Sequence, residues 1–213
     1  MELRGNRIKI APIKLEDVYS IKNWGIHENP LLADYNLCHL SDRQLEEWYY
    51  YKTNRSNQRY FSVFNEENRM IGYFGIKNIR KILKDALLGI VFDPNYVNQG
   101  YGTETLMTFL DYYFNVLKMR KLYLEVTKYN KRALRCYQKN GFKIVGEYLY
   151  EFFDQNIDTN NPYFMEEQSS FVIKKGKIYN YIYKMEIDRK AYLKERDIIE
   201  KTKAKNQVGS TVK

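Results

Sequence analysis

The chain has 213 residues, with 35 Lys and Arg against 26 Asp and Glu, and a formal net charge of +9. Hydrophobic residues make up 44% and aromatic residues 16%, which excludes a disordered chain and fits one domain or at most two small ones. The longest apolar stretches, such as residues 86–92, are far shorter than the roughly 20 residues that span a bilayer. We expect neither a membrane span nor a secretory signal.

The positive charge is concentrated at the end of the chain. Residues 189–213 contain eight Lys and Arg and three Asp and Glu, so they contribute +5 of the +9. We expect this basic tail to begin as a helix and to end in disorder. The charge alone leaves nucleic acid, an anionic membrane and a phosphate-bearing cofactor open as partners.

Cysteine and histidine are too sparse for a disulfide framework or a standard metal site. Cys38 and Cys136 are the only cysteines, which favours a reducing cytoplasm. The spacing of His27, Asp34, Cys38 and His39 matches no standard zinc pattern, so no metal is expected.

The first half of the chain predicts two helices and an antiparallel meander. Residues 7–13 alternate as a strand, and residues 15–24 have helical spacing. Ser41 and Gln44 form a capping box before a second helix. Apolar runs over 60–64, 70–79 and 86–92 are separated by short polar turns, which indicates three antiparallel strands.

The second half alternates helices and strands. The patterns predict a helix over 102–117, a strand over 121–127, a helix over 131–139 that closes at Asn140-Gly141, and two strands over 143–153 and 179–187. The whole order describes a mixed α/β domain.

A glycine-containing turn joins the strand 86–92 to the helix that follows. Gly100 and Gly102 allow backbone N–H groups to approach a phosphate, and the helix N-terminus adds a partial positive charge. The alternative is a turn that simply needs positive φ. A Walker loop would need Lys where Thr103 stands, and a dinucleotide fingerprint would want a small residue at Thr105.

Several motifs together resemble the GCN5-related N-acetyltransferase (GNAT) superfamily, and within it the branch of ribosomal-protein and spermidine N-acetyltransferases. They are residues 89–94, 100–104, 122–126, Asn130, Ala133-Leu134 and 137–142. The resemblance is dense from about residue 86 to residue 153. It implies an α/β (α+β) fold with a mixed, mostly antiparallel central sheet of about seven strands flanked by about four helices.

The same resemblance implies a single N-acetyltransferase domain over residues 1–188, followed by the basic tail 189–213. An insertion over about 154–177 separates the last two strands and carries Asp154, Asp158, Glu166 and Glu167. We hypothesise that it shapes the acceptor pocket or a subunit contact, and that its acids favour a cationic amine. The alternative is a surface insertion without a role.

By the family pattern the co-substrate is acetyl-CoA. Main-chain groups of Ile90, Val91 and Phe92 would pair with the pantetheine arm, and Asn130 would bind the pantetheine amides. The pyrophosphate would be wrapped by Asn98, Gln99, Gly100, Tyr101, Gly102 and Thr103. Val97 stands where the family usually has Gln or Arg, which removes a side chain but not the backbone donors.

Acetyl transfer to an amine needs the neutral amine. A Lys-like ammonium with a pKa of about 10.4 is neutral in only about one molecule in 2,500 at pH 7, a deficit of roughly 4.6 kcal/mol. The resemblance implies Glu125 as general base, acting through a water, and Tyr137 as the acid that protonates the leaving thiolate. The alternatives are a strand glutamate that faces solvent or pairs with Lys, and a tyrosine that packs in the core.

Two other candidates are weaker. Cys136 precedes Tyr137 on the same helix, so we expect it to point elsewhere and to be buried rather than to act as a nucleophile. The aromatic run 48–51 spreads round a helix, so we expect part of it to pack and part to line a pocket rather than to form a base-stacking platform.

The sequence therefore predicts an acetyl-CoA-dependent N-acetyltransferase in which a primary amine attacks the thioester directly in a ternary complex. A catalytically idle acyl-CoA sensor and a nucleic-acid-binding module that uses the basic tail are the alternatives. Polyamine, peptide N-terminus, amino sugar and aminoglycoside all stay open as the acceptor. We expect no membrane or nucleic-acid partner, and a homodimer is compatible with the resemblance.

Overall fold

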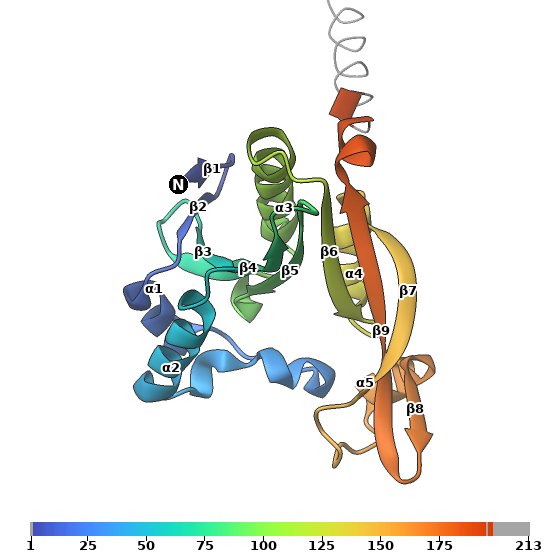
Figure 1. Cartoon of the computed structure of the whole chain (residues 1–213). Helices are drawn as coiled ribbons and strands as arrows, with labels where there is room; N and C mark the ends of the chain where they lie inside the picture. The colour runs from blue at the N-terminus through green and yellow to red at the C-terminus, as the bar shows by residue number, and fades with distance from the viewer. Residues whose placement is uncertain (1, 195, 198–213) are drawn as a thin grey trace, which may run out of the picture.

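The computed structural model describes residues 2–194, 196 and 197. Its strands form one mixed sheet in the order β1-β2-β3-β4-β5-β6-β9-β7, and β8 pairs with β9 outside this path (Figure 1). The strands are β1 (Leu3–Arg4), β2 (Lys9–Pro12), β3 (Arg59–Phe64), β4 (Met70–Arg80), β5 (Asp85–Phe92), β6 (Lys121–Thr127), β7 (Lys143–Glu151), β8 (Phe171–Lys174) and β9 (Lys177–Asp188).

Helices cover both faces of this sheet. The labelled α-helices are α1 (Leu15–Tyr19), α2 (Asp42–Thr53), α3 (Tyr101–Asp111), α4 (Lys131–Lys139) and α5 (Pro162–Glu166). Short 3-10 helices are η1 (Ser20–Asn23), η2 (Pro30–Tyr35), η3 (Leu37–His39), η4 (Pro94–Tyr96) and η6 (Gln168–Ser170), and η5 (Tyr112–Val116) is a π-helical turn.

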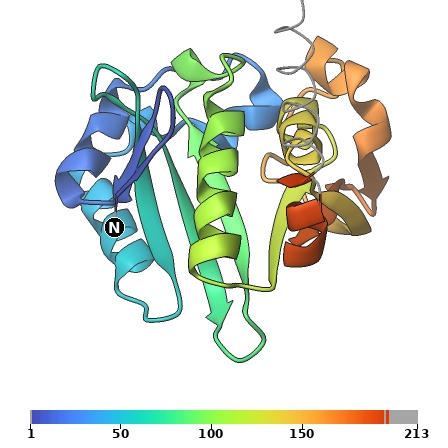
Figure 2. The ribbon, with the colours of Figure 1, turned by 90° about the horizontal axis from the view of Figure 1, so that it is seen from above.

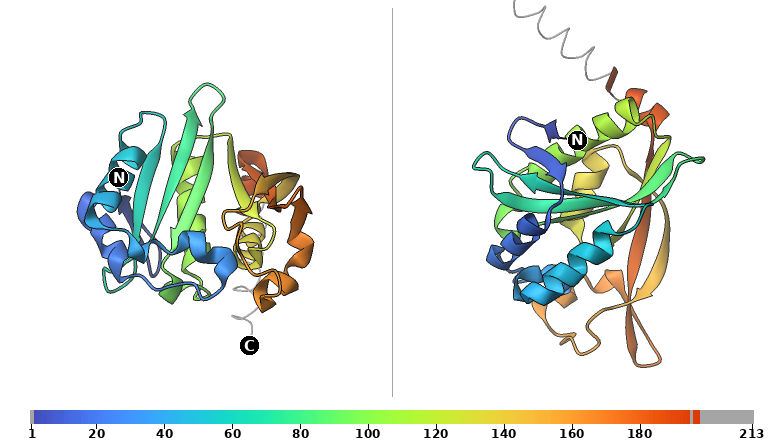
Figure 3. Two further views of the ribbon diagram at one scale, coloured as in Figure 1. Left: turned by 90° about the horizontal axis from the view of Figure 1, so that it is seen from below. Right: turned by 60° about the vertical axis from the view of Figure 1, so that its left-hand side comes forward.

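Alternation along the meander strands creates two cores. Phe61 on β3 and Phe74 on β4 belong to the cluster that packs against α3, whereas Tyr60 and Tyr73 belong to the cluster that packs against α1 and α2. Because successive strand side chains point to opposite faces, α3 lies across one face and α1 and α2 lie on the other (Figures 2 and 3).

A third cluster joins the insertion to the N-terminal half. Phe164 from α5 and Phe171 from β8 pack with Leu31 and Leu32 of η2. The rings of Phe164 and Phe171 stack with their centroids 4.4 Å apart. The insertion is therefore not a plain loop, because it contains a helix and a strand and contributes to a buried core.

The feature that matters most for function is the junction of β5 and β6. The two strands are the parallel pair in this sheet, and their register runs from Asp85 opposite Lys121 to Leu88 opposite Leu124. Beyond Leu88, β5 continues to pair with β4 but no longer with β6. The sheet therefore divides at this point and exposes one main-chain edge of each strand.

The expected fold class is confirmed: the sheet is mixed and mostly antiparallel, with helices on both faces. Two strands beyond the expected seven, β1 and β8, are short. The capping box of Ser41 and Gln44 is present, and Gly141 follows α4 with a φ of 86°. The expected helices 15–24 and 102–117 are α-helical only in their first part. The first continues as the 3-10 helix η1 and the second as the π-helical turn η5.

The end of the chain is only partly covered. Residues 189–194, 196 and 197 are helical, and the expected disorder falls on residues 198–213, which lie outside the described residues. In the part that the structure covers, no helix is both long and apolar enough to cross a membrane.

Candidate active site

A cavity of about 490 Å³ opens where β5 and β6 separate. One wall is β5 from Leu88 to Phe92 with the turn into α3. The facing wall is β6 and one side of α4 along its whole length. Tyr60 on β3 and Lys77 on β4, with Lys52 on α2, line the end that lies further from the glycine-containing turn, whereas Tyr73, opposite Val91, lines the cavity nearer that turn.

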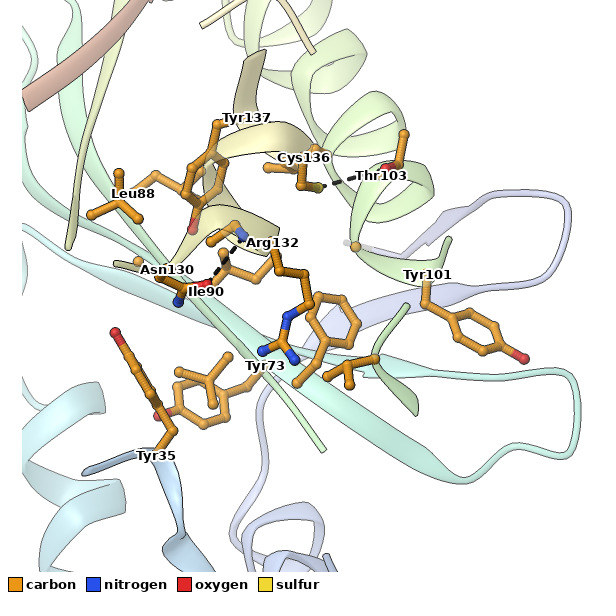
Figure 4. Close-up of a pocket in the computed structure, with 18 of the residues that line it drawn as sticks. Tyr35, Tyr73, Leu88, Ile90, Tyr101, Thr103, Asn130, Arg132, Cys136 and Tyr137 are labelled. Atoms are coloured by element: carbon orange, nitrogen blue, oxygen red, sulfur yellow. Dashed lines mark hydrogen bonds between the residues drawn. The ribbon is translucent and has the colours of Figure 1, made fainter. Parts of the chain in front are cut away.

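The turn before α3 has the backbone geometry of an anion site. Asn98 has a φ of 61° and Gly100 a φ of 87°, and Gly100 is the N-cap of α3. This conformation turns the first N–H groups of the helix toward the cavity, where the helix dipole favours negative charge. The ring of Tyr101 points away from the cavity (Figure 4), and its hydroxyl donates to Glu66 at 3.0 Å.

Arg7 holds this turn from outside. Its guanidinium donates to the carbonyl of Gln99 at 3.2 Å and to Glu104 at 3.1 Å, and its charge lies 4.6 Å from the centre of the Tyr101 ring. These contacts connect the turn to the N-terminal segment.

Helix α4 brings polar and cationic groups to the opposite wall. The side chain of Asn130 accepts from the N–H of Ala133 at 3.1 Å and caps the helix, which leaves its NH₂ group toward the cavity (Figure 4). Arg132, Arg135 and Lys139 also line the cavity. Burial lowers the pKa of Arg132.

Two tyrosines enter the cavity from opposite sides. Tyr137 on α4 is 8% exposed, and Tyr35 of η2 faces it across the space between the strands, with both hydroxyls directed inward (Figure 4). Burial, and then the nearby Tyr35, raise the pKa of Tyr137. Tyr137 is therefore protonated at neutral pH and has a proton to donate.

Glu125 lies on β6 just past the point where the strands separate. It lines the cavity, and its side chain is exposed. Burial raises the pKa of Tyr148 on β7 to about 12, with contributions from the charge of Glu125 and from a hydrogen bond to it. Lys184 is the cross-strand partner of Glu125. The carboxylate therefore lies next to the Tyr148 hydroxyl and lines the cavity.

The structure brings almost every predicted site residue to this one cavity. Gln99 is the exception, since it does not line the cavity and its side chain donates to the carbonyl of Asn95 at 2.8 Å. The predicted site residues that do line the cavity are Ile90, Val91, Phe92, Asn98, Gly100, Tyr101, Gly102, Thr103, Glu125, Asn130 and Tyr137.

The expectation that Cys136 points elsewhere and is buried is wrong. It lines the cavity, is partly exposed, and its Sγ lies 3.5 Å from the hydroxyl of Thr103. The cavity follows the long axis of α4, so residues on two sides of that helix reach it. Burial raises the pKa of the thiol, which opposes thiolate formation and a nucleophilic role.

Part of the aromatic run 48–51 packs as expected, but the expectation that another part lines the pocket is wrong. Trp48 and Tyr49 pack on the second core, Tyr50 and Tyr51 are exposed, and none of the four lines the cavity. Within the described residues, no group of three His, Cys, Asp or Glu side chains could hold a metal ion.

The acids of the insertion do not reach the cavity. Asp154 and Asp158 accept from backbone N–H groups two residues ahead, and Glu167 pairs with Lys131 at 3.1 Å. An effect of the insertion on the pocket would therefore be indirect, through η2 and Tyr129 of the third core or through the ion pair with Lys131 on α4.

Several lining residues were missed by sequence reasoning. Arg132, Arg135 and Lys139 follow a helical three-and-four spacing that could have been read as one cationic face. Tyr35 ends the 3-10 helix η2 and His27 lies in the loop before it, far from the motifs, and no local sequence pattern marks either residue. Lys52 and Lys77 meet only because α2 packs beside β4.

Comparison with known proteins agrees with this geometry. Residues 7–143 match the acetyltransferase (GNAT) domain family. The chain is 30% identical over 156 residues to the spermidine N(1)-acetyltransferase of Escherichia coli K12, covering 68% of this chain and 78% of that protein.

Solved structures of low sequence identity share the fold. One is the spermidine N-acetyltransferase from Vibrio cholerae in complex with CoA and spermine, with a TM-score of 0.64, 22% identity, and coverage of 88% of this chain and 98% of that one. Another is a dodecameric structure of the Vibrio cholerae spermidine N-acetyltransferase, with a TM-score of 0.62, 23% identity, and coverage of 88% and 96%.

A divided sheet, with the N-terminus of a helix at one end of the opening, has room for an extended ligand between two strands. The chain belongs to the GNAT acetyltransferase family. This membership confirms the predicted enzyme class, an N-acetyltransferase, and the predicted co-substrate, acetyl-CoA.

Proposed function

We propose that the protein transfers the acetyl group of acetyl-CoA to a primary amine by direct attack of the amine on the thioester in a ternary complex. The observation that carries this proposal is the divergence of β5 and β6 after Leu88 and Leu124, which opens a cavity between the exposed edges of two strands. Acceptor and donor can meet there without a covalent enzyme intermediate.

The donor would lie along β5. Asp93 donates to the carbonyl of Ile71 at 2.9 Å, and because alternate residues of β5 point toward β4, Val91 also faces β4. The main-chain groups of Ile90 and Phe92 point the other way and have no β6 partner, so they are available to the amides of the pantetheine arm in the manner of an added strand. Asn130 offers its amide to the same arm. The pyrophosphate would lie at residues 98–103 on the N-terminus of α3, with Arg135 and Lys139 supplying positive charge from the facing helix.

Glu125 and Tyr137 would move the protons. The carboxylate of Glu125 would take a proton from the incoming ammonium through a water, which addresses the deficit of roughly 4.6 kcal/mol set by the amine pKa. The phenol of Tyr137 would donate to the departing thiolate. The apolar surroundings raise the proton affinity of the thiolate and of the Tyr137 phenolate alike, so Tyr137 keeps its proton until the thiolate forms.

The setting and assembly are also proposals. The two cysteines are free thiols, which fits a reducing cytoplasm. The dodecameric relative favours an oligomer, and the homodimer stays a prediction. We treat residues 1–188 as the catalytic domain and the remaining residues as its tail.

Calorimetric titration with acetyl-CoA, followed by thiol release with a panel of primary amines, tests the function. We expect micromolar binding and amine-dependent release of free CoA. An acyl-CoA sensor would bind the donor and release no thiol with any amine. A nucleic-acid-binding module would show no micromolar binding of the donor. Either result would remove the proposal.

A further inference from the structure

Two lysines converge at the end of the cavity furthest from the anion-binding turn. Lys77 lies on β4, and its Nζ is 3.7 Å from the point that a Cβ on Gly89 would occupy. Lys52 lies in the last turn of α2, with its Nζ 5.3 Å from the centre of the Tyr60 ring and 5.5 Å from that of Trp48. Both lysines line the cavity.

Neither lysine is neutralised within the described residues. No carboxylate in that part of the chain lies within 4.0 Å of either ammonium group, and neither donates a side-chain hydrogen bond there. Burial first, and then the charge of Lys77, lower the pKa of Lys52. Two cations that repel each other in a partly dehydrated site gain stability when an anion lies between them.

This pair is too far along β5 to serve the pyrophosphate. Phe92, the last residue before the turn into α3, pairs with Gly72, whereas Lys77 pairs with Leu87. Gly72 and Lys77 are five residues apart on β4, a distance of roughly 16 Å at about 3.3 Å per residue. The lysines therefore lie beyond Ile90, at the end where the thioester of an extended donor would react.

The rest of the lining offers little to a polycation. Among the described residues, Glu125 is the acidic side chain that lines the cavity, against Lys52, Lys77, Arg132, Arg135 and Lys139. The acids of the insertion are directed elsewhere. A polyamine would bring further ammonium groups next to Lys52 and Lys77, where like charges repel.

We propose that the acceptor of this N-acetyltransferase is a primary amine that also carries an oxyanion, a carboxylate or a phosphate, which Lys52 and Lys77 bind at the acyl end of the cavity. This inference rests on the proposed function and specifies its acceptor. Glu125 would face the amine of the same molecule, so the site separates one negative charge for the ammonium from two positive charges for the oxyanion.

Matched pairs of amines test the proposal, because the members of a pair differ mainly in the anion. Thiol release is measured with 2-aminoethyl phosphate against ethanolamine, 4-aminobutyrate against butylamine, and spermidine. In at least one pair we expect kcat/KM to be at least about tenfold higher for the anionic amine than for its partner. The pair that shows this preference identifies the anion as a phosphate or a carboxylate. Lys77→Gln should remove that preference, Lys77→Arg should restore it, and exposed Lys81→Gln should leave it unchanged.

A binding measurement covers the case in which every amine reacts slowly. Protein saturated with CoA is titrated calorimetrically with inorganic phosphate and with each anionic amine. We expect binding that weakens at least about tenfold in Lys77→Gln and in Lys52→Gln. Absence of anion binding, or binding that neither variant alters, would overturn the inference.

Two further outcomes would also overturn it. The first is a preference for spermidine over both anionic amines. The second is faster transfer from succinyl-CoA than from acetyl-CoA to a neutral amine, which would mean that the lysines recognise a carboxylate on the acyl group. Acetyl-CoA binding is measured on every variant. A chain that fails to bind the donor contradicts the proposed function, whereas one that binds it and acetylates amines without an anion as fast as the anionic ones contradicts only this inference.

Discussion

Tyr137 is the residue whose environment most directly matches a catalytic task. It is buried, protonated and directed into the cavity. We expect Tyr137→Phe to lower kcat by about tenfold or more and to leave the Kd for acetyl-CoA unchanged, because only the proton donor is lost.

The control for Tyr137 is Tyr129→Phe. Tyr129 is also 8% exposed, but it packs in the third core and does not line the cavity. Its variant should keep kcat. Equal turnover of Tyr137→Phe and the parent protein would assign Tyr137 to packing alone.

Glu125 is tested best through the pH dependence of the reaction. We expect Glu125→Gln to lower kcat/KM at least tenfold at pH 7, because the amine then loses its proton without help. The loss of kcat/KM in Glu125→Gln should become smaller between pH 7 and pH 9, because the free amine becomes more abundant. Exposed Glu147→Gln on β7 is the control. If the loss of kcat/KM in Glu125→Gln does not depend on pH, Glu125 is not a general base.

His27 links the stability of the fold to pH. Burial, and then the charge of Arg132, lower its pKa from 6.5 to about 4. Between these values the unfolded chain binds more protons than the folded one, so the free energy of unfolding rises with pH through this window. The linked change is on the order of 1 to 2 kcal/mol, because solvent reaches the half-buried ring.

Urea unfolding of the parent and of His27→Gln at pH 4.5 and pH 7 measures this linkage. The variant should lose the part of the pH dependence that belongs to His27, whereas His39→Gln, at an exposed position, should retain it. An identical pH dependence in His27→Gln and the parent would refute the assignment.

At the scale of elements, the turn before α3 depends on one glycine. Gly100 has a φ of 87°, and a Cβ there would lie 3.1 Å from the guanidinium of Arg7. We expect Gly100→Ala to cost about 1 to 2 kcal/mol of stability. It should also weaken acetyl-CoA binding by roughly tenfold, since the strain displaces the N–H groups that face the phosphate.

Gly146→Ala is the matched control for this turn. Gly146 lies in β7 without positive φ, and a Cβ there would meet nothing within 4 Å. Calorimetric titration and urea unfolding should therefore show no change. Parent-like donor affinity in Gly100→Ala would exclude this turn as the phosphate site.

At the scale of the whole molecule, the third core couples the insertion to the acceptor side of the cavity. Phe164 is 3% exposed and packs with Leu31 and Leu32, and Tyr35 of the same 3-10 helix packs on this cluster. We expect Phe164→Ala to destabilise the fold by about 3 kcal/mol. The KM for the amine should rise severalfold without a change in acetyl-CoA affinity.

Met165→Ala is the control for that prediction, because Met165 is 51% exposed. Urea unfolding and separate donor and acceptor kinetics measure both effects. If Phe164→Ala lowers stability but leaves the acceptor KM unchanged, the insertion supports the fold without shaping the pocket.

Local patterns were sufficient for most elements and for the donor side of the site. Residue types a few positions apart in the sequence are enough to predict three features: the capping box at Ser41, the meander and the glycine at the end of α4. The turn at Gly100 and the cap at Asn130 are local in the same sense. The π-helical end of α3 and the core made by the insertion depend on distant partners and were not predicted.

The sequence by itself determined the order of strands and helices, the family and the candidate donor site, because each depends on residue types at fixed short spacings. Only the tertiary structure decided what lies opposite that site. The positive charge that is most informative about function is not in the basic tail, which carries +5 of the +9, but in Lys52 and Lys77. They are brought together because α2 packs across β4, a long-range contact that no local spacing encodes.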